Sequence, residues 1–250
     1  MTDIHSTDAV VLKSVDYSDT SLIVRLFTRD YGKMTVISKG ARRSKRGLGG
    51  MLRPPNQLSI TYRHRDNRDI QTLTACEYAA RHPGLLTDMA RSTAAMMAIE
   101  MLDKSVHEYD PQPLLYRLIA AFIAELGEAD SDPTSLIHFY QLHLAVQLGF
   151  APHLDRCVHC GKPLQTAVVE SVAGHLSCPR CRPSGGQRLS RESLVYLRGL
   201  RSTHITDLVS LTVDKKASDA AGQFLMGHLF AHVEGLDKLK SLNFWQQVRP

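Results

Sequence analysis

Four of the five cysteines fall into two Cys-x-x-Cys pairs, a residue type and spacing suited to binding a metal ion. Cys157 and Cys160 form the first pair, Cys178 and Cys181 form the second, and 17 residues separate the pairs. Four thiolates fill the tetrahedral shell of Zn²⁺ and leave no position for water or substrate. We therefore predict one zinc ion with a structural role. A redox-active dithiol and two chance pairs are the alternatives.

The residues around the cysteines favour a small zinc ribbon. Gly161 permits a tight turn directly after the first pair, and residues 166–176 have the β-branched pattern of a hairpin that turns at Ala173 and Gly174. His159 lies between two ligands, and we expect it on the surface rather than on the metal. Cys76, outside the pattern, is predicted to be a small buried hydrophobic residue.

A second candidate site is the glycine-rich loop at residues 38–50. Five of the eight residues 39–46 are basic and none is acidic, the basic ones being Lys39, Arg42, Arg43, Lys45 and Arg46. Dense cations on a mobile loop suit a phosphate backbone of variable geometry. We predict a nucleic-acid contact here, and the alternative is a solvated connector.

The distribution of charge supports a polyanionic partner for the N-terminal part. The net charge is +5; residues 1–80 hold 13 basic and 8 acidic residues, whereas residues 81–250 hold 17 of each. Asymmetry of this kind is typical of nucleic-acid binding. We add Arg25 and Lys33 to the predicted contact, together with Tyr62 as a base-stacking ring. For Tyr62 and Tyr31 core packing is an even alternative, and for Phe27 it is favoured.

The hydrophobic pattern predicts an α+β chain. Five β-branched runs, at residues 9–16, 20–29, 32–39, 57–62 and 70–78, have the number and size of the strands of an OB-fold barrel, although an SH3-like barrel would look similar. From residue 82 the spacing becomes helical, with helices expected over 82–107, from about 113, from 133 to 149, from Ser190, and over 219–236. We predict an OB-fold domain at 1–80 and a helical domain at 81–250, the latter with the zinc ribbon inserted at about 152–189.

The N-terminus is polar, with no secretory signal behind it, and no run is long enough to span a membrane, so we expect a cytoplasmic protein. An enzyme such as a zinc-dependent nuclease is disfavoured. The predicted metal site is closed, and the sequence has no His-Glu-x-x-His, P-loop or dense carboxylate cluster.

Two N-terminal strings resemble the opening of the bacterial RecO family of DNA-repair proteins: residues 17–33, YSDTSLIVRLFTRDYGK, and residues 39–43, KGARR. The resemblance implies an OB-fold followed by a helical domain with a zinc element, the four cysteines as ligands, and the basic loop as DNA contact. It also implies a recombination mediator of the RecF pathway, without enzymatic activity and associated with the nucleoid. Such proteins bind single- and double-stranded DNA and anneal strands coated with single-stranded-DNA-binding protein (SSB). They work with RecR, often with RecF, to load the recombinase RecA. The alternative is an OB-fold and zinc-ribbon adaptor that binds RNA.

Overall fold

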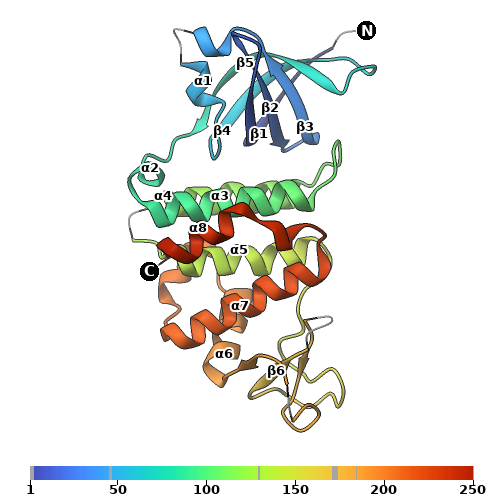
Figure 1. Ribbon diagram of the computed structural model, residues 1–250, viewed down its shortest axis with the longest axis vertical. Coiled ribbons are helices and arrows are strands. Elements are labelled where there is room, and N and C mark those ends of the chain that lie inside the picture. Colours follow the sequence, from blue (N-terminus) through green and yellow to red (C-terminus); the bar gives the residue numbers. More distant parts are fainter. Residues whose placement is uncertain (1–2, 45–46, 129, 171–173, 184, 250) are drawn as a thin grey trace. The chain divides into compact units, whose positions relative to one another are not determined.

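The computed structural model describes residues 3–44, 47–128, 130–170, 174–183 and 185–249, and its contacts divide the chain into two compact units (Figure 1). Unit 1 is Met1–Ala124 and unit 2 is Glu125–Pro250. Within the described ranges, no helix has both the length and the apolar character that crossing a membrane would require.

Unit 1 contains a closed five-stranded barrel, drawn in blue to cyan in Figure 1. Its strands are β1 (Asp3–Tyr17), β2 (Ser21–Thr28), β3 (Gly32–Ser38), β4 (Gln57–His64) and β5 (Ile70–Ala80). They close in the order β1-β2-β3-β5-β4; β3 and β5 are parallel and the other pairs are antiparallel. This OB-like barrel confirms the fold class predicted from the sequence.

The barrel forms because alternate residues of its strands are apolar and point inward. On β2 the inward residues are Leu22, Val24 and Leu26, all fully buried in the barrel core. Phe27 points outward yet is also buried, because its ring packs at 6.4 Å from the ring of Tyr116 on helix α4 (Pro113–Gly127). The outer face at this point is therefore covered by the part of α4 that belongs to unit 1.

Two further helices belong to unit 1, α2 (Gly84–Thr87) and α3 (Met89–Ser105), where the sequence predicted one helix over residues 82–107. The helix is interrupted because Asp88 adopts an extended conformation and its carboxylate accepts a hydrogen bond from the backbone N–H of Arg91, at 3.0 Å. The predicted boundary after residue 80 coincides with the end of β5, but the compact unit continues to Ala124. Whether residues 1–80 form an independent domain stays a prediction.

Unit 2 is mainly helical. Its helices are α5 (Pro133–Gln147), α6 (Arg191–Ser202), α7 (Lys215–His232) and α8 (Lys240–Val248), with 3-10 turns η2 (Ile205–Ser210) and η3 (Leu236–Lys238). Asp132 caps α5 by accepting from the N–H groups of Thr134 and Ser135 at 3.1 and 2.9 Å, and Ser190 caps α6 as predicted. Helix α7 begins four residues earlier than predicted, because Asp214 is its cap.

Candidate metal centre and nucleic-acid interface

The segment between α5 and α6 folds as a small three-stranded sheet, the ribbon. Its strands are β6 (Ala167–Val169), β7 (Leu176–Ser177) and β8 (Arg188–Leu189), in the order β7-β6-β8. The antiparallel pairing of β6 with β7 is the predicted hairpin. At its turn, Gly174 has a φ of +60°, which favours glycine, whereas Ala173 lies outside the described residues. Strand β8 was not predicted, since two residues are too short to show a pattern.

The ribbon brings the four predicted cysteines together. The Sγ atoms of Cys157, Cys160, Cys178 and Cys181 all lie within 4.8 Å of one another. Each pair forms a tight turn: the N–H of Gly161 donates to the carbonyl of Cys157 at 2.9 Å, and the N–H of Cys181 to that of Cys178 at 3.0 Å. Four convergent sulfurs are a donor set that could hold one metal ion, and they fit a tetrahedral thiolate site.

Protonation of the cysteines also suits a metal site. Burial raises the pKa of Cys157, but hydrogen bonds from the backbone N–H groups of Cys178, Cys160 and His159 outweigh burial and bring the pKa down to about 6. The pKa of Cys181 is raised to about 12 by hydrogen bonds with the side chains of Cys178 and Cys160. The convergent backbone N–H groups therefore favour the thiolate form of Cys157, the form in which a cysteine binds a metal.

A carboxylate links the two cysteine turns. Glu170 accepts a hydrogen bond from the hydroxyl of Ser177, and its Oε1 lies 2.5 Å from Nε2 of His159 and its Oε2 4.0 Å from Arg182. The hydrogen bond from Ser177, followed by that with His159, lowers the pKa of Glu170. His159 is thus exposed and engaged with Glu170, as expected for a surface residue. Such contacts orient ligand-bearing turns around a metal.

The predicted basic loop is more ordered than the sequence indicated. It contains a 3-10 turn, η1 (Ala41–Arg43), and a short helix, α1 (Leu48–Met51), each preceded by a glycine with φ near +70°. Ala41 is buried, and Leu48 and Met51 pack against the barrel core. The loop is therefore anchored to the barrel at both sides of Lys45 and Arg46, which lie outside the described residues.

The loop cations differ in how free they are. The guanidinium of Arg42 donates to the carbonyl of Ser18 at 3.0 Å and lies 3.4 Å from Asp16. Lys39 and Arg43 are exposed, and within the described ranges neither side chain makes an ion pair or hydrogen bond. Among the loop cations that the structure describes, Lys39 and Arg43 are therefore the most available to a phosphate.

Arg25 and Lys33 are engaged inside unit 1. Arg25 makes two hydrogen bonds to the carboxylate of Asp103 on α3, at 2.9 and 3.2 Å. Lys33 has a side chain only 12% exposed, and its ammonium donates to the carbonyl of Asp103 at 2.7 Å. Both residues fasten α3 to the barrel, so their charges are already engaged within unit 1. A nucleic-acid contact by either residue stays a prediction.

The prediction that the ring of Tyr62 stacks on a base needs correction. Its ring is 1% exposed in the barrel core, so it cannot stack on a base in this conformation. Burial raises the pKa of its hydroxyl above the usual range. Tyr31 is half-buried, with its hydroxyl 2.7 Å from Nδ1 of His5, and Phe27 is buried as favoured above.

Sequence reasoning missed a set of arginines at the turn between β4 and β5. Arg63, Arg65 and Arg68 are all exposed. The buried side chain of Gln71 stabilises this turn through three hydrogen bonds. It donates to the carbonyls of Arg65 and Arg68 at 3.1 and 2.6 Å, and it accepts from the N–H of Arg65 at 2.9 Å. The charge count over residues 25–68 contained this signal, with 12 basic and 2 acidic residues.

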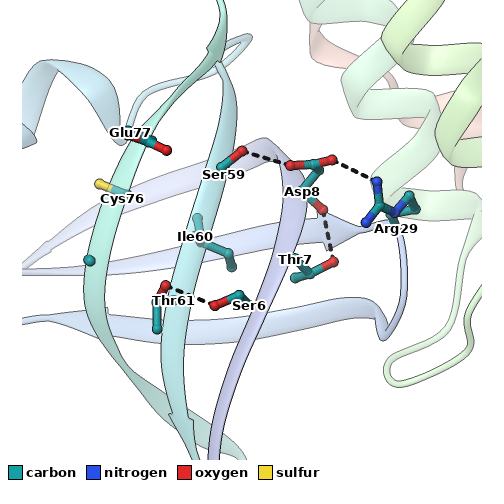
Figure 2. A pocket seen from close by; sticks show the side chains of 10 residues that line it. Ser6, Thr7, Asp8, Arg29, Ser59, Ile60, Thr61, Cys76 and Glu77 are labelled. Atoms are coloured by element: carbon teal, nitrogen blue, oxygen red, sulfur yellow. Dashed lines mark hydrogen bonds and ion pairs between the residues drawn. The ribbon is translucent and has the colours of Figure 1, made fainter.

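A hollow of about 490 Å³ on the outside of β1, β4 and β5 is unsuited to DNA (Figure 2). Among the described residues that line it, the cation is Arg29, which is held by Asp8 at 2.8 Å and by Asp30 at 3.2 Å. Figure 2 shows Asp8 also accepting from Ser59, at 2.7 Å, and Glu77 adds another carboxylate. The carboxylates of this surface would repel phosphates, so the hollow is a poor candidate for a DNA contact.

Unit 2 contains a larger cavity, of about 830 Å³, formed by α5, α7 and α8. Its lining includes apolar Met226, Phe230 and Trp245, with Lys216 and Arg249 as cations. Asp219 also lines it and lies 2.9 Å from Arg249, so the charge of Arg249 is paired. Gln141 also lines it; this side chain is 2% exposed, and among the described residues its Oε1 has no hydrogen-bond partner. An apolar cavity with a few convergent polar groups is typical of a binding site. The sequence did not reveal it because α8 was not predicted.

Comparison with known proteins gives consistent matches along the chain. Residues 1–81 match the family model described as Recombination protein O N terminal, and residues 86–243 match Recombination protein O C terminal. A protein named DNA repair protein RecO from Myxococcus xanthus is 32% identical over 98% of this chain and 98% of its own length. One of the same name from Geobacter metallireducens is 28% identical with the same coverage, and one from Salinibacter ruber is 37% identical over 60% of this chain and 58% of the relative.

Proposed function

Because the chain belongs to the RecO family of DNA repair proteins, we propose that it is a recombination mediator that binds single- and double-stranded DNA and anneals complementary strands coated with SSB. In this proposal it helps RecR, with RecF where required, to load RecA. The mediator acts by holding strands rather than by cleaving or forming bonds, so it has no enzymatic activity. It works at the nucleoid in the cytoplasm.

The observation that carries the proposal is the exposed positive charge on two loops of the barrel, the basic loop between β3 and β4 and the turn between β4 and β5. Lys39 and Arg43 are exposed without a partner among the described residues, and Arg42 has one carboxylate at 3.4 Å. Lys45 and Arg46 add two charges in the sequence between η1 and α1. On the second loop, Gln71 supports a turn whose arginines are exposed, and the corresponding loop of OB-folds binds oligonucleotides.

We assign the four sulfurs to one Zn²⁺, which would stabilise the ribbon. Cys157, Cys160, Cys178 and Cys181 would hold the ion as thiolates. Four sulfur ligands close the coordination shell, so the site would supply a crosslink rather than an activated water.

Annealing of two complementary oligonucleotides coated with SSB, without nucleotide, tests the proposal. We expect the native chain to anneal them rapidly and an Arg42/Arg43/Lys45/Arg46→Ala variant to be at least tenfold slower. High salt should suppress the native activity because the binding is electrostatic.

Annealing by the variant at the native rate would remove the loop from the mechanism. No annealing by a folded, metal-loaded native chain would favour the RNA-binding adaptor, which a competition between DNA and RNA of equal length would then reveal.

We further propose that the cavity of unit 2 holds the C-terminal tail of SSB. Gly227 lines this cavity, and a Cβ added to it would meet no atom within 4 Å. A larger side chain at this position would therefore not clash with the protein but would occupy the cavity. We expect Gly227→Leu to weaken binding of a labelled SSB-tail peptide at least tenfold and the matched control Gly227→Ala to leave it nearly unchanged. Equal binding by both variants would place the tail elsewhere.

A further inference from the structure

Positive and negative charges are segregated within unit 2. Residues 152–204, which comprise the ribbon and α6, hold 8 basic and 3 acidic residues, whereas the remainder of the unit holds 5 basic and 9 acidic residues. The two parts of unit 2 therefore carry net charges of +5 and −4, which nearly cancel. A surface that merely keeps a protein soluble usually mixes the two signs.

The ribbon cations gather where the four sulfurs converge. Arg156, Lys162, Arg180 and Arg182 each lie within two residues of a cysteine of the cluster, and all four are exposed. Because the four Sγ atoms lie within 4.8 Å of one another, these side chains surround the metal end of the ribbon.

Most of these cations are free of carboxylates. Over the ranges that the structure describes, Lys162 and Arg180 make no ion pair, and Arg156 donates to a carbonyl, that of Gly161, at 3.0 Å. Arg182 lies 4.0 Å from Glu170. On the neighbouring α6, in contrast, Arg201 is bound to both carboxylate oxygens of Asp155 at 2.9 and 3.2 Å.

A simpler explanation is that the cations only offset the charge of the metal site. Four thiolates and one divalent ion together carry two negative charges. The ribbon has five basic side chains, the four above and Arg188 on β8, and two acids, Glu170 and Asp155. A positive surplus therefore remains at the surface after the metal site is neutralised.

We propose that the metal end of the ribbon is a second contact for a nucleic-acid phosphate backbone, in addition to the loop on the barrel. The inference rests on the proposed function, because annealing needs two strands held at once. The chemistry fits phosphates better than an acidic peptide, since among the described ribbon residues the large apolar side chain exposed is Val158, at 40%. A peptide would need apolar pockets beside the charges. The hollow of about 580 Å³ at Val158 has the carboxylate of Asp155 in its lining, and neither Lys162 nor Arg180 lines it.

Capture of one DNA by another tests the proposal. Poly-dT on beads is mixed with the full-length protein and with labelled poly-dT, which cannot pair with the first strand. We expect the native protein to retain the labelled strand and a Lys162→Ala/Arg180→Ala variant to retain at least fivefold less. The affinity of the variant for a single oligonucleotide, which the barrel binds, should differ less than twofold from that of the native protein.

The matched control is Arg201→Ala. It also removes a positive charge from unit 2, but the carboxylate of Asp155 already neutralises that charge. The metal content of each variant is measured. If the Lys162→Ala/Arg180→Ala variant contains no metal, the Lys162→Gln/Arg180→Gln variant is used in its place.

If the ribbon variant captured the labelled strand as well as the native protein does, the proposal would be wrong. Two associated chains, each binding one strand through its barrel, would give that result. Poly-glutamate and unlabelled poly-dT are compared as competitors for the labelled strand. If poly-glutamate displaced that strand as readily as poly-dT does, and did so from the native protein but not from the variant, the assignment to nucleic acid would be wrong. Binding of one strand without capture of a second would refute the second contact and leave the proposed function intact. No DNA binding at all would refute the proposed function.

Discussion

Replacing Cys178 and Cys181 together by serine is expected to abolish metal binding and to unfold the ribbon. The ribbon has strands of only three, two and two residues, joined by four pairs of residues, and its buried apolar side chains are few. A sheet this small is marginal in water. Structural zinc contributes on the order of 10 kcal/mol in isolated zinc modules, so its loss would exceed what the ribbon's own packing supplies.

The measurement is the metal content per chain together with limited proteolysis. We expect about one metal ion per native chain and none in the variant, with new cleavage between residues 152 and 189. Acid should release the metal from the native chain, because protons compete with it for the thiolates.

The control for this variant is Cys76→Ser. Cys76 packs, half-buried, against the barrel core, where burial raises its pKa, so its replacement should leave the metal in place. A double cysteine variant that kept its metal and resisted the protease would show that the four sulfurs are not the site.

Patterns that are local in the sequence were predicted correctly. Strand alternation gave the five barrel strands to within a few residues except for β1, which begins at Asp3 rather than residue 9. Its first residues are polar and pair with β4, so their place in the sheet depends on a partner more than 50 residues away. The cysteine spacing predicted the four-sulfur cluster because each pair is closed by its own turn.

Features that depend on distant partners were missed. The pairing of Arg25 and Lys33 with Asp103 joins residues at least 70 positions apart, and no local pattern indicates it. The burial of Tyr62 follows from its inward register on β4, which a single aromatic in a short run does not determine. Helix α8 starts without a side-chain cap, so the usual signal for a helix start was lacking.

Removing Lys39 and Arg43 is expected to cause a larger loss of DNA affinity than removing any other two cations of the basic loop that the structure describes. Both side chains are exposed and unengaged among the described residues, so their charges are available to phosphates. Each phosphate contact on a single strand contributes roughly 0.7 to the slope of log affinity against log salt concentration. A Lys39→Ala/Arg43→Ala variant should therefore lower the magnitude of that slope by about 1.4 and the affinity at ~0.1 M salt by roughly 10- to 30-fold.

The matched control is Arg25→Gln/Arg29→Gln, which removes the same number of positive charges from the barrel. Arg25 is held by Asp103, and Arg29, with its side chain 49% exposed, is held by Asp8 and Asp30, so these charges are neutralised in the folded chain. Fluorescence anisotropy of a labelled single strand over a salt series gives both slopes. If the two variants lost affinity equally, net charge alone would govern binding and the loop would not be a site. A loss confined to Lys39 and Arg43 would mean that the position of the free cations, anchored by η1 and α1, determines where the strand lies.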